Sequence, residues 1–182
     1  MPPTESGPVH PEQWPDACTF LTDREINALL PGHENVERTP EPVTVLDPDF
    51  MSDDNLTGDA KSGSCDYQIH YSADRSIDIT ITITTVADPE TVRPHYEQER
   101  ASAIERKTKW DFVKSVDVGG ADACFRSGSD TYSTLECHRG PLAFEVSTSG
   151  HVEIEGVSED PNQVLQDRLQ PEVVKTLTGK IG

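Results

Sequence analysis

The sequence predicts an α+β fold in which an antiparallel sheet of about six to eight strands is flanked by three helices, in the order α-β-β-β-α-β-β-β-α. Two observations lead to this class. Runs of alternating apolar and polar residues follow one another through short turns, which is typical of antiparallel strands. Helix-start signals at Thr22, Asp88 and Asp160 divide these runs into two groups. A chain of 182 residues is long enough to bury one core.

The first helix is predicted over residues 22–30. Thr22 and Glu25 have the spacing of a capping box, in which the hydroxyl and the carboxylate satisfy free backbone donors of the first turn. Pro31 and Gly32 end the helix, because proline cannot continue it and glycine accepts the left-handed exit conformation.

An edge strand is expected over residues 36–46, since Pro40 and Pro42 lack the N–H that a central strand donates. An acidic loop is predicted over residues 47–63. It is rich enough in oxygen ligands for calcium, but its spacing does not fit an EF-hand loop and no glutamate closes it. We therefore interpret it as a solvated loop.

The clearest strand signal lies in residues 66–84, where isoleucine and tyrosine alternate with polar residues on either side of a turn at residues 72–75. One face of this hairpin is apolar and the other is polar. The polar face offers hydroxyls, an amide and an imidazole for a glycan or a peptide strand, and its candidate ligand residues are Gln68, His70, Thr80, Thr82 and Thr84. The alternative is ordinary β-propensity on a solvated sheet face.

The second half of the chain is similar to the first in the order of its predicted elements. A helix is predicted from Asp88 to about residue 107, because aspartate followed by proline is a helix start. Strands are expected over residues 110–118 and onwards to residue 154. A last helix begins at Asp160 and is interrupted at Pro171.

The four cysteines are interpreted as two disulfides. They allow three pairings, and local geometry favours Cys18 with Cys65 and Cys124 with Cys137. None of them has the C-x-x-C spacing or the nearby histidine of a zinc site. Two disulfides imply an oxidising compartment, and the alternative is four buried thiols in a cytosolic protein.

In the predicted hairpin between Cys124 and Cys137, the symmetric strand register does not fit the pattern of apolar and charged residues. A symmetric register puts Arg126 opposite Leu135 and Phe125 opposite Glu136, so that charged and apolar residues share a face. We therefore expect a bulge or a shifted turn in this hairpin.

Charge narrows the range of partners. The chain has 33 acidic and 15 basic residues, a formal net charge of -18, and this acidic protein would repel nucleic acid and anionic membrane surfaces. Basic partners and neutral ligands remain open.

The N-terminal residues 1–15 are proline-rich and poor in core residues, which is typical of a tether between a domain and an anchor. We expect a single domain over residues 16–182, and a signal peptide or lipid-anchor segment that has been removed. The alternative is a frayed N-terminus without an anchoring role. No stretch of the sequence has the length of a transmembrane helix.

One segment resembles a known family. The run DACTFLTDRE at residues 16–25 resembles the D-P/A-C-x-L-L-T-x-x-E opening of small actinobacterial lipoproteins, a family catalogued only as a domain of unknown function. GSCDY at residues 63–67 matches the family's second cysteine, and GADA at residues 120–123 is similar to its G-x-x-A segment. The resemblance implies an exported, lipid-anchored protein with a helix-flanked antiparallel sheet similar to the PsbP-like fold of a photosystem subunit. It implies no catalytic residues. The chain departs from the family in lacking a lipobox cysteine and in having Phe20 for leucine.

The sequence has no recognisable motif for metal binding, nucleophilic catalysis or phosphate binding. The histidines follow no H-x-x-x-H spacing, so we predict neither a metal site nor a cofactor; they are His10, His33, His70, His95, His138 and His151. There is no G-x-S-x-G elbow and no glycine-rich phosphate loop, and the cysteines are assigned to disulfides. We predict no catalytic residues.

The leading hypothesis is an exported, lipid-anchored cell-envelope protein, at the cell surface or secreted, that acts as a monomeric, non-enzymatic binding module. Its partner would be an envelope protein or a glycan, and it would meet the membrane only through a removed anchor. A second hypothesis is an envelope hydrolase whose site is built from scattered acids and histidines, which requires a deep pocket with convergent titratable groups. A third is a regulatory or inhibitory lipoprotein that acts on a basic partner.

Overall fold

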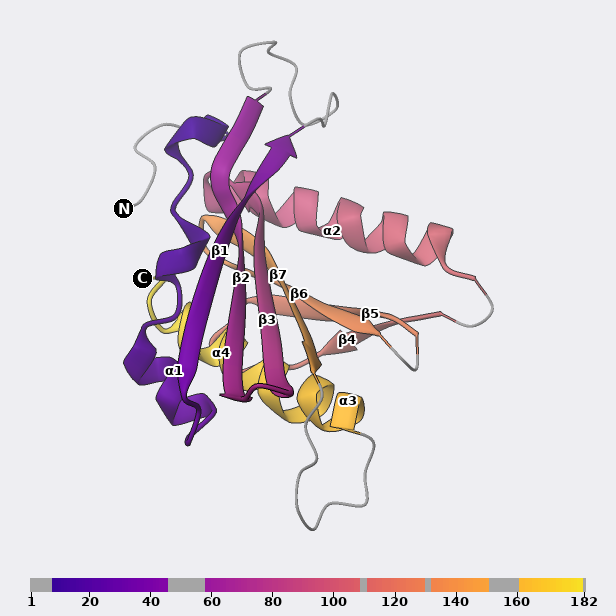
Figure 1. The fold of residues 1–182 in the computed structure, drawn as a ribbon. Coiled ribbons are helices and arrows are strands. Elements are labelled where there is room, and N and C mark those ends of the chain that lie inside the picture. Colours follow the sequence, from indigo (N-terminus) through magenta and orange to yellow (C-terminus); the bar gives the residue numbers. More distant parts are fainter. Residues whose placement is uncertain (1–7, 46–57, 109–110, 130–131, 151–160, 182) are drawn as a thin grey trace.

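A computed structural model describes residues 8–45, 58–108, 111–129, 132–150 and 161–181 of the chain, and it confirms the α+β class. Its main feature is a seven-stranded antiparallel sheet in the order β1-β2-β3-β7-β6-β5-β4 (Figure 1). The strands are β1 (Asn35–Val45), β2 (Gly58–Ser72), β3 (Arg75–Val86), β4 (Phe112–Val116), β5 (Ala123–Gly128), β6 (Ser133–Arg139) and β7 (Leu142–Gly150).

Helices cover both faces of this sheet. The first helix, α1 (Asp23–Leu29), has the predicted capping box, in which Thr22 and Glu25 bond each other's backbone N–H. Helix α2 (Pro89–Arg106) begins after Asp88, whose carboxylate accepts bonds from the N–H groups of Glu90 and Thr91. The last helical stretch consists of α3 (Pro161–Val164), the π-helical turn η4 (Leu165–Leu169) and α4 (Gln170–Thr178). In Figure 1, α2 and the α3–α4 stretch lie on opposite sides of strands β4 to β7.

Two features differ from the predicted element order. Four strands, not three, follow α2, and the last helix consists of two α-helical segments, α3 and α4, joined by a π-turn just before Pro171. Proline has no N–H to bond the preceding turn, so the interruption falls where the sequence predicted one.

The loop predicted over residues 47–63 is too long. Strand β2 begins at Gly58, and its first residues pair with the end of β1, including Thr44 with Asp59. The prediction was too long because the many acidic residues after β1 are typical of a loop, whereas one of them, Asp59, belongs to the paired end of the β1–β2 hairpin. The remainder of the predicted loop, residues 47–57, lies outside the described residues.

The expected bulge in the cysteine hairpin was wrong. Cys124 pairs with Cys137, Phe125 with Glu136 and Arg126 with Leu135, in one unbroken register. The register holds because Arg126 is neutralised under the helical stretch: its guanidinium lies 2.5 Å from a carboxylate oxygen of Asp167 and also donates to the backbone carbonyl of Gln166. A buried charge that is paired costs far less than a lone one.

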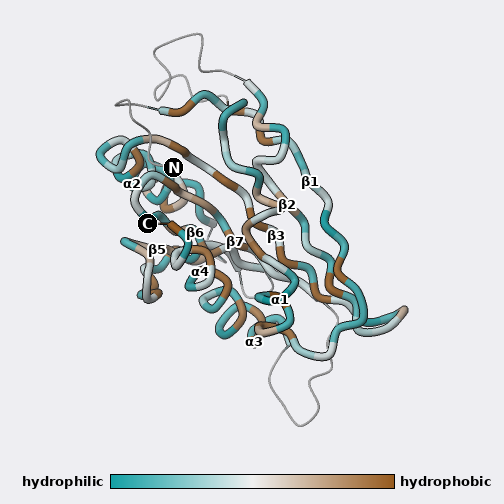
Figure 2. Tube along the Cα trace, turned by 90° about the vertical axis from the view of Figure 1, so that its left-hand side faces the viewer, coloured by the Kyte–Doolittle hydropathy of each residue, from teal (hydrophilic) through white to brown (hydrophobic). Residues whose placement is uncertain are grey.

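The main core lies between the sheet and the helices α1, η4 and α4. The apolar face of β3 supplies four buried isoleucines, and Phe144 and Val146 of β7 lie beside them. Val173, Val174 and Leu177 of α4 close this core. Figure 2 shows hydrophobic segments recurring along β3 and β7, whereas α2 is largely hydrophilic.

The two predicted disulfides are both present. Cys18 is bonded to Cys65, and Cys124 is bonded to Cys137. The first bond joins the short 3-10 helix η2 (Ala17–Thr19) to the centre of β2, and the second joins the neighbouring strands β5 and β6. Disulfides of this kind are typical of proteins from oxidising compartments.

Candidate functional site

The polar face of the β2–β3 hairpin is a hydrogen-bonded network of side chains. The Ser64 and Thr82 hydroxyls lie 2.8 Å apart, and the Thr80 hydroxyl donates to the carboxylate of Asp66 at 3.0 Å. These pairs join residues that stand opposite each other on the two strands. Because each side chain is held by its cross-strand partner, the network is ordered before any ligand arrives.

The network continues at the turn end of the hairpin through Asp78. Its carboxylate accepts side-chain hydrogen bonds from Gln68 and from Ser149 of β7. Burial, together with the nearby Asp66, raises the pKa of Asp78 above its ordinary value. One Asp78 oxygen is buried without a hydrogen-bond partner, and so is Nε2 of His70, which lies 4.0 Å from the carboxylate of Glu37.

Helix α2 covers only one end of this face. It packs against β6, β7, β4 and the end of β3, where the Thr85 hydroxyl lies 2.7 Å from Nδ1 of the buried His95. Gln68, His70, Thr80 and Thr82 are half-buried, so each keeps a surface that a partner can reach.

Thr84 lies at a break in the pairing of β3 with β7. The pairing of β3 with β7 shifts between Ile83 and Thr85, which leaves Thr84 as the unpaired residue of a bulge. Its hydroxyl is buried without a hydrogen-bond partner. Among the predicted residues, Gln68, Thr80 and Thr82 therefore join the hydrogen-bonded network, whereas the Thr84 hydroxyl takes no part in it.

A second cluster of polar groups lies beneath α2. Glu136 of β6 and Glu145 of β7 stand directly opposite each other. Glu136 is only 8% exposed, and one of its oxygens has no hydrogen-bond partner. Burial raises the pKa of Glu136 to about 8, with Glu145 and Glu99 adding repulsion and Arg106 opposing it. Burial raises the pKa of Glu145 as well, with a contribution from Glu99.

Aromatic packing closes this cluster on the side nearer β5. The Tyr96 ring of α2 lies 5.4 Å from the Phe125 ring and 4.6 Å from the imidazole of His138. Burial raises the pKa of Tyr96 far above its ordinary value, and burial lowers that of His138 even though Asp122 lies beside it. Both shifts favour the uncharged form of the group, which suits its buried position.

Sequence reasoning missed the acid pair, although a signal for it exists. Gly140 and Pro141 form the turn between β6 and β7, with Gly140 at a φ of 52°. Glu136 and Glu145 are equidistant from that turn, so a Gly-Pro hairpin turn would have placed them opposite each other.

The histidines lie at separate places among the described residues. His10 accepts a bond from the Glu12 N–H, His33 contacts the Leu30 carbonyl, and His138 lies near Asp122. His151 lies outside the described residues. Within the described ranges, no group of three or more His, Cys, Asp or Glu residues has the arrangement of a metal site.

Neither family models, nor curated proteins, nor solved structures match this chain. In the part of the chain that the structure describes, no helix is long and apolar enough to span a membrane.

Proposed function

We propose that this protein acts outside the cytoplasm, at the cell envelope, as a binding module and not as an enzyme. The polar face of β2 and β3 is its contact surface, and an envelope protein or a glycan is its partner. The lipid anchor belongs to this proposal through the resemblance of residues 16–25 to small actinobacterial lipoproteins.

The observation that carries the proposal is the ordered network on a partly exposed sheet face. Hydroxyl, carboxylate and amide groups are fixed there by cross-strand bonds, from Ser64 and Thr82 at one end to Gln68 and Asp78 at the other. A ligand that meets such a surface immobilises few side chains on binding, so less of its binding energy is lost.

The two disulfides support the compartment. Thiols are kept reduced in the cytosol of most cells, so a stable pair of disulfides favours a protein that matures outside it. The net charge of -18 favours neutral or basic partners over nucleic acid.

The acid pair favours a structural role over hydrolysis. A catalytic carboxyl must come within hydrogen-bond reach of its substrate, and Glu136 is closed in between β6 and α2. We therefore give Glu136 and Glu145 no part in the proposed function.

The test compares the protein with two arginine variants of similar size. Thr80→Arg places a long charged side chain in the middle of the polar face, whereas Thr44→Arg places one at the exposed end of β1. Binding of each immobilised protein to solubilised envelope proteins and to an envelope glycan array is measured by biolayer interferometry. We expect the wild type and Thr44→Arg to bind alike and Thr80→Arg to lose at least about tenfold in affinity.

Two results would contradict the proposal. Equal binding by Thr80→Arg and the wild type would remove the polar face from the interface. Recovery of the native protein from the cytosol, with its cysteines open to thiol-reactive labels in intact cells, would remove the envelope location.

A further inference from the structure

A short N-terminal segment is held across β2 at both of its ends. At one end Pro8 bridges Ala87, and the Val9 N–H donates to the Val86 carbonyl at 2.7 Å. At the other end Cys18 is bonded to Cys65. We call residues 8–18 the strap. Its middle is fixed by Trp14, whose indole N–H donates to the Val9 carbonyl at 2.9 Å.

Strand β2 bulges where the strap crosses it. Glu41 pairs with Ser64 and Val43 pairs with Ala60, so the single residue Pro42 stands opposite residues 61–63. Proline has no N–H for the ladder, which leaves this part of β2 free to leave the regular register. Gly63 is required here because a Cβ atom would lie 2.9 Å from the Val43 side chain.

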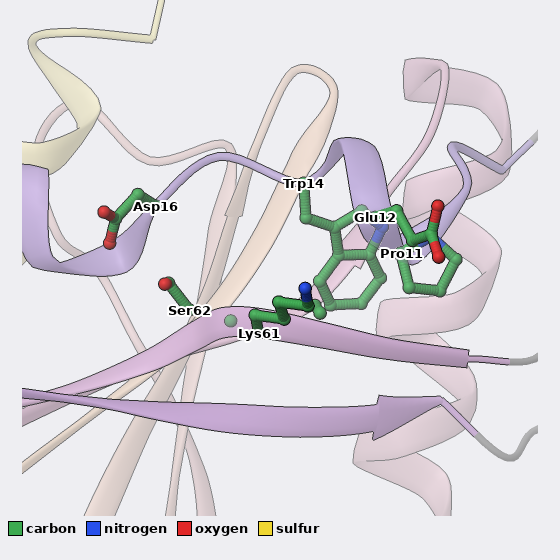
Figure 3. A pocket seen from close by; sticks show the side chains of 8 residues that line it. Pro11, Glu12, Trp14, Asp16, Lys61 and Ser62 are labelled. Atoms are coloured by element: carbon green, nitrogen blue, oxygen red, sulfur yellow. The ribbon is translucent and has the colours of Figure 1, made fainter.

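The strap and the bulge line a pocket of about 400 Å³ that is open to solvent on one side, and its volume is within the size range of small-molecule sites. Figure 3 shows Trp14 and Lys61 facing each other across it, with Glu12 towards one end and Asp16 and Ser62 towards the other. Its lining residues are Pro11, Glu12, Trp14, Asp16, Ala60, Lys61, Ser62 and Gly63.

We propose that this pocket binds one or two units of a neutral saccharide. The indole of Trp14 offers a flat apolar surface for the C–H face of a sugar ring, and its orientation is fixed by the bond to Val9. The carboxylates of Glu12 and Asp16 accept bonds from sugar hydroxyls, while Lys61 and Ser62 donate to sugar oxygens. The pocket thus combines an aromatic platform with both donors and acceptors.

Charge disfavours the other ligand classes. An anion would be opposed by two pocket carboxylates and by the net charge of the whole chain. A compact cation would meet the ammonium group of Lys61 inside the pocket. A neutral polyhydroxylated ring avoids both penalties. The pocket is separate from the polar face, since none of its residues belongs to that network.

The experiment follows the Trp14 indole signal in ¹H–¹⁵N NMR spectra of the intact, oxidised protein, with Trp14→Phe used for assignment. The probes are cellobiose, maltose and diacetylchitobiose, and choline, inorganic phosphate and glycylglycine serve as charged comparisons. We expect at least one disaccharide to shift the indole signal saturably. Lys61→Met and Glu12→Gln should each weaken that binding by about three- to tenfold, because each removes a charged hydrogen-bonding group from the pocket.

The matched controls are Lys107→Met and Glu105→Gln, which change the same residue types at the exposed end of α2. Both should bind the disaccharide as the wild type does. The proposal is overturned if no disaccharide gives a saturable shift, if a charged probe binds more tightly, or if the pocket variants behave like their controls. Such a failure would leave the polar-face proposal standing, because Thr80 is unchanged in every one of these proteins.

Discussion

At the scale of single residues, the most unusual group is the carboxyl of Glu136. Its pKa is raised to about 8, so near neutral pH the folded protein holds a proton that the unfolded chain releases. The neighbours that face it are Glu145 from β7 and Glu99 and Arg106 from α2. Burial is the largest cause of the raised pKa, and the two neighbouring acids add a repulsion that the single guanidinium opposes.

From the raised pKa of Glu136 we predict that the free energy of unfolding falls as pH rises. Because the folded pKa lies above the unfolded value near 4.5, the contribution is complete below about pH 4.5 and is lost as pH rises towards 8. Glu136→Gln keeps the shape of the neutral acid and removes the titration. We expect the free energy of unfolding of this variant at pH 9 to exceed that of the wild type by about 2–4 kcal/mol.

Urea denaturation at pH 5, 7 and 9 measures this difference. Glu105→Gln changes an exposed glutamate at the end of α2 and should leave the pH profile unaltered. If the free energy of unfolding changes with pH in the same way in the wild type and in Glu136→Gln, Glu136 does not titrate in this range and the prediction is wrong.

At the scale of elements, α1 illustrates how local and distant contacts combine. The helix has only seven residues, too few to be stable alone, so its capping box matters. Glu25 also accepts a bond from the Nζ atom of Lys180 at 2.6 Å, and Lys180 donates to the Phe20 carbonyl as well. The start of α1 is therefore tied to the C-terminal end of the chain.

Removal of the cap should destabilise the protein. Thr22→Ala deletes the hydroxyl that accepts from the Glu25 N–H, and we expect a loss of about 1 kcal/mol in the free energy of unfolding. Thr22→Ser retains the hydroxyl and should lose at most about half of that. Urea denaturation of both variants makes the comparison. An equal loss in the two variants would mean that the methyl group, and not the capping bond, carries the effect.

At the scale of the whole molecule, the two disulfides differ in what they join. One links strands that the sheet already pairs, and the other links the N-terminal segment to β2. Cys124 and Cys137 are 13 residues apart and already face each other on paired strands. Cys18 and Cys65 are 47 residues apart, and their bond holds the strap on β2. The longer loop restricts the unfolded chain more strongly.

The two bonds should therefore differ in their effect on stability. Loop entropy predicts a loss of about 4 kcal/mol for the pair Cys18→Ser and Cys65→Ser, and about 3 kcal/mol for Cys124→Ser and Cys137→Ser. Denaturation curves of the two double variants measure these losses, and intact mass with and without reductant confirms that the wild type is fully oxidised. A wild-type mass that reductant does not change would overturn the assignment of both bonds.

Much of the fold could be predicted because the signals are local. The capping box at Thr22, the alternation on either side of residues 72–75 and the Asp88-Pro89 helix start depend on neighbours within a few residues, and all three are confirmed. The cysteine pairs could also be predicted, since one spans a hairpin. The envelope location, the anchor and the ligand residues on the polar face stay predictions.

Only the tertiary structure decided how the buried charge of Arg126 is paired and where the surface forms a pocket. The sequence determined the α+β class, the edge position of β1 and the polar and apolar faces of the hairpin, because periodicity and proline act along the chain. It could not show that Asp167 would neutralise Arg126, or that residues 61–63 would bulge beneath Trp14. Those contacts join segments about 40 to 50 residues apart, and only packing of the helices and the strap on the sheet brings them together.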